Sequence, residues 1–381
     1  MSSSGHVTHP VRPAPLFLGS ERGSALLTIR LGALVENFRL CAISSVISVA
    51  GVVKADAYGL GAAPIARALA DAGCDTFFVA RLEEGIAVRP FVPQARIFVL
   101  DGILSENVEH FLVHRLTPVL NSLDEISVWS QAAALRRTTL DAAVHFDTGM
   151  NRLGLPPNEL AVLSTEAAKR LAGINPVLMM SHLACSDDPA SKMNSEQLQR
   201  FRAGLAMLPP APASVSASGG ILLGKDYAFD LVRPGIALYG GNPHPATPNP
   251  FRTVVQLTGR ILQVRRVDKG ESVGYGATFR TARPSTLATV ALGYADGLMR
   301  AIGNKGSGAI GGVRVPVAGR VSMDLITLDV TEIPSAEPGT EVEFIGDTIS
   351  LEEAARSAGT ANYEILTGLG SRFPRHYVSA P

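Results

Sequence analysis

The chain has 381 residues, of which 46% are hydrophobic and 18% are charged. A chain of this length and composition can bury at least one large core and is expected to divide into two domains. Lys plus Arg and Asp plus Glu both number 34, so no excess of positive charge favours nucleic acid or an anionic membrane surface as a partner. The expected partners are therefore small molecules.

The cysteines and the N-terminal residues indicate the cellular compartment in which the protein is expected to act. Cys41, Cys74 and Cys185 are scattered and odd in number, which fits neither a disulfide framework nor a zinc site, so we expect no metal and a reducing cytoplasm. Residues 1–23 lack the continuous apolar segment of a secretory signal and are predicted to form a flexible tail. The apolar run 46–53 is far shorter than the ~20 residues that span a bilayer, so no transmembrane segment is predicted.

Residues 24–245 are predicted to form a (β/α)8 barrel of the TIM type, which makes the fold α/β. Short β-branched runs alternate there with longer amphipathic stretches, as expected of βα units around a parallel sheet. The runs cover residues 46–54, 76–80, 96–100, 117–120, 142–149, 177–184, 214–218 and 229–240. In such a barrel the chemistry lies at the C-terminal ends of the strands.

Residues 246–381 are predicted to form a C-terminal β-rich domain. After about Pro250, strand pairs are broken by turn signals such as VDKGES, and helical potential is found mainly in LEEAARSAG. The early run LLTIRL, at positions 26–31, precedes the first helix of the barrel. We expect this strand to cross back and join the sheet of the second domain.

Lys54 is the first residue that indicates chemistry. It ends an apolar strand in the segment VVKADAYGLG at positions 52–61. Burial of a lysine is costly unless the amine is solvated, paired or covalently used, and desolvation lowers its pKa towards the value that a Schiff-base amine needs. A lysine that simply reaches solvent at the strand end is the alternative interpretation of this one segment.

The segment around Lys54 resembles the lysine signature of alanine racemases. The resemblance continues in the order of that family and covers nearly the whole chain after about Ser24. The further motifs are HFDTGMNRLG, MSHLA, LVRPGIALYG, GYG, LGYADG, GRVSMD and NYEIL. One short motif would be weak evidence, but eight in the same order are specific.

The resemblance implies a racemase that interconverts L-alanine and D-alanine with pyridoxal phosphate as cofactor. Lys54 would bind the cofactor covalently and exchange a proton with one face of the substrate's α-carbon, and Tyr275 would act on the opposite face. Taken alone, a tyrosine between glycines is more often a structural ring in a turn. The product D-alanine would supply peptidoglycan, although a catabolic role stays open.

The resemblance also implies which residues hold the cofactor. Arg233 would face the pyridine nitrogen and, because a guanidinium can only donate hydrogen bonds, would keep that nitrogen unprotonated. His182 would lie beside the ring and link Arg233 to Tyr275. The phosphate would be bound by a set of hydroxyl and amide groups near the last two strand ends, from Tyr58, Ser218, Gly235, Ile236 and Tyr363.

Four further residues are implied to contact the substrate or to narrow its entry: Arg152, Met323, Asp324 and Tyr294. Two positions depart from the family pattern. Ala217 stands where an asparagine commonly precedes the phosphate-binding serine. His145 stands where many members have a lysine that is carbamylated to orient the matching arginine, and because histidine cannot form that carbamate, Arg152 must be held by His145 itself, an anion or water.

The resemblance implies a homodimer in which each site combines the barrel of one subunit with the β-domain of the other. Three alternatives remain open. A racemase of broader range would act on serine, lysine or arginine. A decarboxylase of the same architecture generally pairs the pyridine nitrogen with a carboxylate, and Arg233 argues against it. A non-catalytic pyridoxal-phosphate carrier would have no use for the β-domain and its Tyr275.

Overall fold

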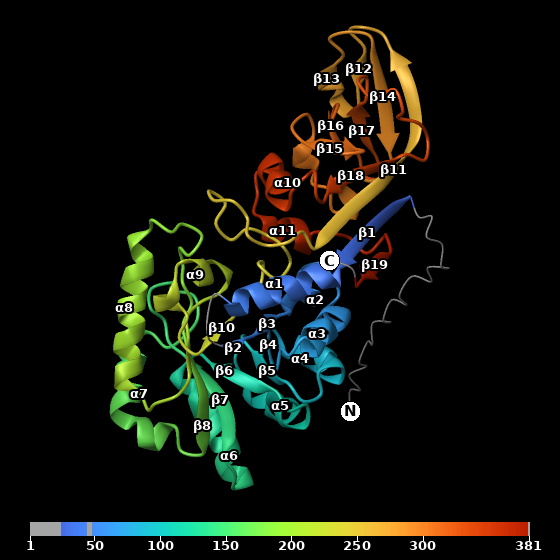
Figure 1. The fold of residues 1–381 in the computed structure, drawn as a ribbon. Helices are drawn as coiled ribbons and strands as arrows, with labels where there is room; N and C mark the ends of the chain where they lie inside the picture. Colours follow the sequence, from blue (N-terminus) through green and yellow to red (C-terminus); the bar gives the residue numbers. More distant parts are fainter. Residues whose placement is uncertain (1–23, 44–47, 380–381) are drawn as a thin grey trace, which may run out of the picture.

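The computed structural model describes residues 24–43 and 48–379, so the tail predicted at residues 1–23 lies outside the described residues. Figure 1 shows an α/β barrel in the N-terminal part of the chain and a β-rich part that continues from it. The long strand β11 (Val255–Val267) leads away from the barrel into the second sheet. The predicted α/β fold class is confirmed.

All eight predicted barrel runs contain parallel strands. The strands are β2 (Ser48–Val49), β3 (Gly51–Val52), β4 (Thr76–Val79), β5 (Arg96–Val99), β6 (Thr117–Leu120), β7 (Leu140–His145), β8 (Ile174–Met180), β9 (Ala213–Ser214) and β10 (Leu231–Val232). The first run is split into β2 and β3 around Ala50. The sheet runs in sequence order from β3 to β9.

Two short contacts close this sheet into a ring. Strand β10 pairs in parallel with β2, through Leu231 opposite Ser48. On its other side, the segment after β9 meets the end of β10 in a parallel bridge between Ala217 and Arg233. Neighbours are therefore hydrogen-bonded all the way around, and the C-terminal strand ends collect at one end of the barrel.

Helices follow the barrel strands and cover their outer side (Figure 1). They are α1 (Leu31–Ile43), α3 (Ala62–Asp71), α4 (Leu82–Val88), α5 (Val108–Val113), α6 (Leu123–Arg136), α7 (Pro157–Arg170), α8 (Lys192–Met207) and α9 (Ser218–Leu222). Helix α6 shows how the local sequence sets the ends: the Ser122 side chain accepts a hydrogen bond from the amide of Glu125 at 3.2 Å, and the helix stops at Arg137 in a left-handed conformation.

The second sheet is mainly antiparallel and runs in the order β16, β15, β18, β11, β1, β19, while β14 pairs with both β11 and β17. A separate hairpin joins β12 (Ser272–Val273) to β13 (Phe279–Arg280). The remaining strands are β14 (Ser285–Val290), β15 (Ser307–Ile310), β16 (Val313–Pro316), β17 (Ile326–Asp329), β18 (Glu341–Ile345) and β19 (Arg375–Val378).

The strand β1 (Ala25–Arg30) belongs to the second sheet although it starts the described chain. It pairs antiparallel with β11 and in parallel with β19, and Leu27 and Ile29 on its inner face are fully buried. The expectation for residues 26–31 is therefore confirmed. The chain passes from β1 directly into α1, so the first helix of the barrel is tied to the β-domain.

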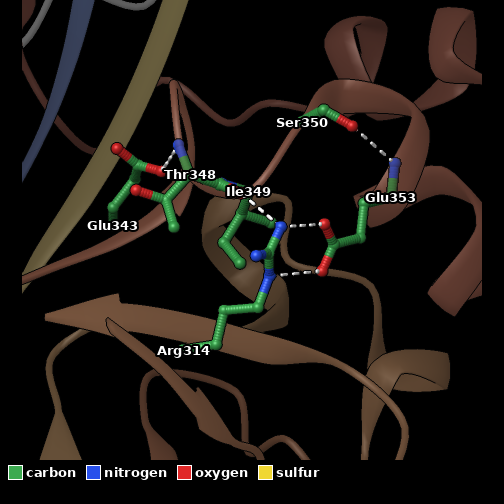
Figure 2. A network of polar contacts seen from close by, with 6 residues as sticks. All are labelled: Arg314, Glu343, Thr348, Ile349, Ser350 and Glu353. Atoms are coloured by element: carbon green, nitrogen blue, oxygen red, sulfur yellow. Dashed lines mark hydrogen bonds and ion pairs between the residues drawn. The ribbon is translucent and has the colours of Figure 1, made fainter. Parts of the chain in front are cut away.

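Helices α10 (Leu351–Ala358) and α11 (Asn362–Thr367) lie against the β-domain on its barrel side (Figure 1). Figure 2 shows the polar contacts that hold α10 there: Arg314 on β16 donates to Glu353 Oε2 and to the Thr348 carbonyl at 2.8 and 2.7 Å. Glu343 on β18 accepts from the amide of Thr348 at 2.8 Å. These contacts fix the loop before α10 and, through it, the position of α11 near the barrel.

Across residues 24–43 and 48–379, no helix combines the length and the apolar character that a membrane crossing requires. The same residues contain no cluster of three or more His, Cys, Asp or Glu side chains arranged to hold a metal ion.

Candidate active site

Lys54 begins α2 (Lys54–Gly59) at the C-terminal end of β3, and this element is a left-handed turn. The four residues from Ala55 to Tyr58 have φ between 52° and 58°. A left-handed helix costs L-residues ~1–2 kcal/mol per residue because Cβ crowds the following carbonyl. None of these four is glycine, so the surrounding structure must hold the turn in place.

Hydrogen bonds hold the turn at its start and middle. The Ala55 amide donates to Glu84 Oε1 at 2.7 Å, and the Ala57 amide donates to the Val53 carbonyl at 2.9 Å. The Asp56 side chain accepts from the amide of Ala62 at 2.7 Å, where α3 begins. Glu84, in the first turn of α4, therefore anchors the backbone directly after Lys54.

The surroundings of Lys54 favour a neutral amine. Burial lowers the pKa of Lys54, and the positive charges of Arg152 and Arg233 lower it further, while Glu84 and Asp101 oppose the shift. A lowered pKa increases the fraction of neutral amine, which is the form that attacks a carbonyl carbon. The interpretation of Lys54 as a lysine that merely reaches solvent does not account for these neighbours.

Arg233 lies buried inside the barrel, where it connects three strands. Its Nη2 donates to the Ser181 carbonyl at 2.7 Å and lies 3.5 Å from His182 Nδ1, and its Nη1 donates to the Ser214 hydroxyl. Burial lowers the pKa of Arg233 to about 10, so the guanidinium remains protonated at neutral pH. The predicted proximity of Arg233 and His182 is present in the structure.

Two histidines beside Arg233 are held neutral. Burial, followed by the charges of Arg233 and Arg152, lowers the pKa of His182 to about 3. Burial, followed by Arg233, lowers the pKa of His145 to about 4. The Nδ1 atom of His145 lies 2.8 Å from Oδ1 of Asn121 at the end of β6. Both imidazole rings are therefore polar but uncharged near pH 7.

The predicted phosphate-binding residues meet at the ends of β9 and β10. The Ser218 hydroxyl accepts hydrogen bonds from the amides of Gly235 and Ala237 at 2.9 and 3.2 Å. The Tyr58 hydroxyl lies so close to Gly235 that a Cβ atom there would be 2.1 Å from it. The ring of Tyr58 packs on Tyr363 of α11 at 6.0 Å between centroids. Glycine is thus required for the backbone to approach these hydroxyls.

Ile236 follows Gly235 in the same turn and is fully buried. The amide of Gly235 already donates to Ser218, so the group that the sequence predicted as a phosphate donor here serves to position that hydroxyl. Ala217 precedes Ser218 and contributes only a methyl group at the position that departs from the family pattern. Its backbone instead forms the bridge to Arg233 that closes the barrel.

Arg152 lies on the loop between β7 and α7, with its side chain exposed. The Asp147 side chain organises this loop by accepting hydrogen bonds from the backbone amides of residues 149–151. Gly154 packs so closely against the loop base that an added Cβ would lie 3.0 Å from Cδ2 of His145. The loop is therefore built against His145, and the guanidinium of Arg152 is close enough to influence the pKa of both histidines.

The other predicted residues lie in the β-domain. Tyr294 begins a short 3-10 turn, and its amide donates to the Ser322 carbonyl at 3.0 Å, while Ala295 donates to the Met323 carbonyl at 2.9 Å. Asp324 forms an ion pair with Arg372 at 2.6 Å. Tyr275 lies between β12 and β13 with 67% of its surface exposed. Met323 is 54% exposed.

The predicted site residues thus form two groups in one chain. The barrel group contains the predicted residues of the barrel, together with Tyr363 from α11: Lys54, Tyr58, Arg152, His182, Ser218, Arg233, Gly235 and Ile236. The β-domain group contains Tyr275, Tyr294, Met323 and Asp324. Figure 1 places the β12–β13 hairpin at the outer end of the β-domain, far from α2. The described contacts do not bring Tyr275 to His182 within the chain.

Sequence reasoning missed several residues that the structure places at the site. Glu84 anchors the lysine turn, and Asn121 bonds His145. Tyr239 packs on Tyr58 with ring centroids 4.7 Å apart and donates to the Val52 carbonyl at 2.8 Å. Tyr239 lies in the quoted motif LVRPGIALYG, so its position could have been noticed. The sequence did not indicate Glu84 or Asn121 as site residues, because each contacts a strand end that is distant in the sequence.

Comparison with known proteins agrees with this arrangement. Residues 29–243 match the family profile described as "Alanine racemase, N-terminal domain", and residues 254–377 match "Alanine racemase, C-terminal domain". The chain belongs to the alanine racemase family. An alanine racemase from Rhodospirillum rubrum is 48% identical over 362 residues, which is 94% of this chain and 96% of that protein. A catabolic alanine racemase from Agrobacterium fabrum is 48% identical over 93% of this chain and 92% of its own.

Solved structures of this family have the same fold. The crystal structure of an alanine racemase from Bartonella henselae, described with covalently bound pyridoxal phosphate, is 40% identical with a TM-score of 0.90, over 93% of this chain and 100% of that one. The biosynthetic alanine racemase from Pseudomonas aeruginosa is 34% identical with a TM-score of 0.88, over 93% and 99% of the two chains. The barrel and β-domain described here are thus the architecture of alanine racemases.

Proposed function

We propose that this protein interconverts L-alanine and D-alanine with pyridoxal phosphate as its cofactor, and that D-alanine supplies peptidoglycan. The observation that carries the proposal is the barrel group itself. A partly buried lysine with a lowered pKa shares one barrel end with Arg233 and with a glycine-lined corner of hydroxyls. Membership of the alanine racemase family indicates which reaction this cluster supports. A division into a barrel at residues 24–245 and a β-domain at 246–381 is part of the proposal, with strand β1 of the first range joining the sheet of the second.

The residues present fit the proposed cofactor. At one end of the cluster, Gly235 leaves the space that a Cβ would fill beside the hydroxyls of Tyr58 and Ser218. These hydroxyls, with the amide of Ile236 and the hydroxyl of Tyr363, would hold the phosphate. At the other end, Arg233 would hold the pyridine nitrogen and His182 would lie beside the ring. Lys54 would bind the cofactor covalently, since its amine is biased towards the neutral, nucleophilic form.

Pyridoxal phosphate, when bound, withdraws electrons from the substrate's α-carbon and so acidifies its α-proton. Lys54 then holds or delivers that proton at its Nζ atom on one face. Arg233 limits the electron-withdrawing strength of the ring, because a protonated guanidinium can only donate and leaves the pyridine nitrogen without a proton. This restraint favours return of the proton to the α-carbon over side reactions.

Tyr275 of a second subunit supplies the second base in this proposal. Within one chain, Tyr275 is largely exposed and lies on a hairpin remote from Lys54. Two bases on opposite faces of the α-carbon are needed for inversion, because one removes the proton and the other delivers one from the far side. A homodimer that places the β-domain group of one subunit over the barrel group of the other would complete each site.

Arg152 and the β-domain loops would bind the substrate. Arg152 is exposed at the barrel end and would hold the cofactor's phenolic oxygen and the substrate carboxylate. Met323 would contribute its backbone from the facing subunit, next to Asp324, and Tyr294 would narrow the entry with Tyr363. Asp324 is engaged by Arg372, which supports a role in shaping the loop around Met323.

The setting of the reaction is proposed to be the cytoplasm. None of the three cysteines, all of which lie among the described residues, forms a disulfide, and Cys41 and Cys74 are buried. Burial raises the pKa of each of these two thiols to about 12, which keeps them protonated and unreactive. Cysteines outside disulfides suit a reducing compartment.

Chiral chromatography tests the proposed activity. The purified protein with pyridoxal phosphate is incubated separately with L-alanine, L-serine, L-lysine and L-arginine, and both enantiomers of each are quantified. Alanine should be racemised fastest by a wide margin. A different preferred amino acid would make the protein a racemase of broader range, and no racemisation of any of them would reject the proposal in favour of a decarboxylase or a carrier.

Two further experiments test the proposed residues. Borohydride reduction should fix the cofactor to a peptide that contains Lys54, and label on any other peptide would reject that assignment. Mixing Lys54→Ala subunits with Tyr275→Ala subunits should restore part of the activity, because one hybrid site then has both bases. Properly exchanged but inactive mixed dimers would contradict the shared site.

A further inference from the structure

The C-terminal strand β19 contacts the left-handed turn that carries Lys54. Arg375 on β19 donates two hydrogen bonds to the Gly59 carbonyl, from Nε at 3.1 Å and from Nη2 at 2.8 Å. The hydroxyl of Tyr377 donates to the Leu60 carbonyl at 2.8 Å. Alternate residues of a strand point to the same face, so Arg375 and Tyr377 reach the turn from one side of β19. Together they bind the two carbonyls with which the turn ends.

Two glycines, Gly59 and Gly61, flank Leu60 where the turn ends and make this contact possible. Gly61 has φ of +96°, and a Cβ there would lie 2.1 Å from the Tyr377 hydroxyl oxygen. Gly59 has φ of +81°, and a Cβ there would lie 2.9 Å from the Leu366 carbonyl oxygen of α11. The glycines of the segment YGLG therefore let the β-domain approach the turn, in addition to allowing its backbone conformation.

The Leu60 carbonyl lies between the end of the turn and the start of α3. Leu60 precedes Gly61, the N-cap of α3, and the first helical bond runs from the Ile65 amide to the Gly61 carbonyl, so the Leu60 carbonyl lies outside the helical ladder. An unpaired carbonyl in a buried position is costly. Tyr377 supplies the missing donor from a different domain.

We propose that Arg375 and Tyr377 are positioning residues that hold the left-handed turn and thereby set how Lys54 and Tyr58 face the cofactor. Glu84 secures the start of the turn and β19 secures its end. Because β19 pairs with β1, the β-domain of a subunit supports the barrel site of that same subunit. The proposal rests on the proposed function for its catalytic meaning, but the support of the turn can be measured without it.

Hydrogen exchange of the full-length protein tests the support directly. The amides of Ala57 and Gly61 donate within the turn, so their exchange rates report its opening. Tyr377→Phe keeps the ring and removes one donor, and Arg375→Met removes two. Each should speed exchange at these amides by about tenfold, while exchange in β4 stays unchanged. His376→Gln is the control, since His376 is exposed on the same strand.

Cofactor binding tests the consequence for the site. With pyridoxal phosphate bound to each full-length variant, Tyr377→Phe and Arg375→Met should raise the dissociation constant about tenfold and shift the pH at which the bound cofactor's absorbance changes. Arg375→Lys keeps a cationic donor. Its dissociation constant for pyridoxal phosphate and its pH midpoint should therefore lie between those of Arg375→Met and those of the unaltered protein. A merely structural role would lower the melting temperature of the variants and leave that pH midpoint where it is in the unaltered protein.

The exchange rates and the cofactor measurements distinguish the support of the turn by β19 from the proposed function of the protein. Unchanged exchange at Ala57 and Gly61 in both variants would overturn the proposed support, whatever the activity. Faster exchange with an unchanged dissociation constant and pH midpoint would overturn the positioning role. If the unaltered protein binds no pyridoxal phosphate, the proposed function fails, and the exchange rates still decide whether β19 holds the turn.

Discussion

The side chains of His145 and Asn121 form a hydrogen bond whose direction is determined by the rest of the barrel. The Nδ2 group of Asn121 donates to the carbonyls of Val119 and Leu100 at 2.9 and 3.2 Å, so its Oδ1 faces His145 Nδ1 as the acceptor at 2.8 Å. His145 must therefore carry its proton on Nδ1. Its Nε2 is left as an acceptor, and its Cδ2 lies against Gly154 of the loop that carries Arg152.

This relationship predicts that substrate binding does not depend on dissolved carbon dioxide. Histidine cannot form the stable carbamate that a lysine can, so the KM for alanine should be the same in bicarbonate-free and bicarbonate-containing buffer. Asn121→Leu should raise the KM about tenfold, because His145 then loses the partner that fixes its tautomer. Steady-state kinetics in degassed buffers measure both effects.

His145→Lys is the matched variant for this prediction. It restores a side chain that can form a carbamate, so its KM should fall when bicarbonate is added. A bicarbonate effect of equal size in the unaltered enzyme would show that His145 does not take over the support of Arg152.

A second prediction concerns stability in acid. The folded-state pKa of His182 is lowered to about 3, whereas an unfolded histidine titrates near 6.5. The unfolded chain therefore binds the extra proton first, and stability that is fully present above pH ~6.5 is lost as the pH falls towards the folded value. Between pH 7 and pH 5 this one residue should cost about 2 kcal/mol of the free energy of unfolding.

Urea unfolding of the unaltered protein and of His182→Gln at both pH values tests this sign. The variant lacks the titrating group, so it should lose about 2 kcal/mol less between pH 7 and pH 5. His114→Gln, directly after the short helix α5, serves as the control for replacing a histidine by glutamine. Equal losses in His182→Gln and the unaltered protein would mean that His182 titrates normally in the fold.

The periodic parts of the fold could be predicted from the sequence. Helix α6 (Leu123–Arg136) lies in one of the longer stretches between the predicted strand runs, and its Ser122 cap is a local signal. Each of the eight predicted runs overlaps at least one of the nine barrel strands. The place of β1 in the second sheet could also be expected, because its run precedes the first helix of the barrel.

The left-handed turn at Ala55–Tyr58 could not be predicted in the same way. Its residues have no intrinsic preference for positive φ, and the conformation exists because Glu84, Arg375 and Tyr377 hold it from distant elements. The same reason hid Asn121, whose importance depends on the pairing of β6 with β7. Family motifs indicated which residues act, and only the fold shows what supports them.

A third prediction tests the corner of hydroxyls beside Gly235. A Cβ at this position would lie 2.1 Å from the Tyr58 hydroxyl, so Gly235→Ala must displace that ring and should raise the dissociation constant for pyridoxal phosphate at least about tenfold. Fluorescence titration of the apoenzyme measures the constant. Gly235→Ala combined with Tyr58→Phe removes the clashing oxygen, so the two changes should be less than additive. Strict additivity would argue that Tyr58 and Gly235 do not share one binding corner.

The last prediction concerns the reaction that Arg233 suppresses. A guanidinium leaves the pyridine nitrogen of the cofactor unprotonated, whereas a carboxylic acid can share its proton with that nitrogen and strengthen the ring's withdrawal of electrons. Arg233→Glu should therefore slow racemisation and, in a single turnover in which the amino group of L-alanine is transferred to the cofactor, raise the ratio of pyruvate to D-alanine by about tenfold or more, a change of ~1.4 kcal/mol in relative barriers. Pyruvate is measured with a coupled dehydrogenase and D-alanine by chiral chromatography.

Arg233→Lys is the control that separates charge from packing. Both substitutions leave the Ser181 carbonyl without its present donor and should cost about 1–3 kcal/mol of stability, but lysine keeps a cation that can only donate. Its ratio of pyruvate to D-alanine should stay near that of the unaltered enzyme even where its rate falls. If the two variants produce pyruvate in the same proportion, the role of Arg233 is to hold the barrel strands together and the selectivity of the reaction comes from elsewhere in the site.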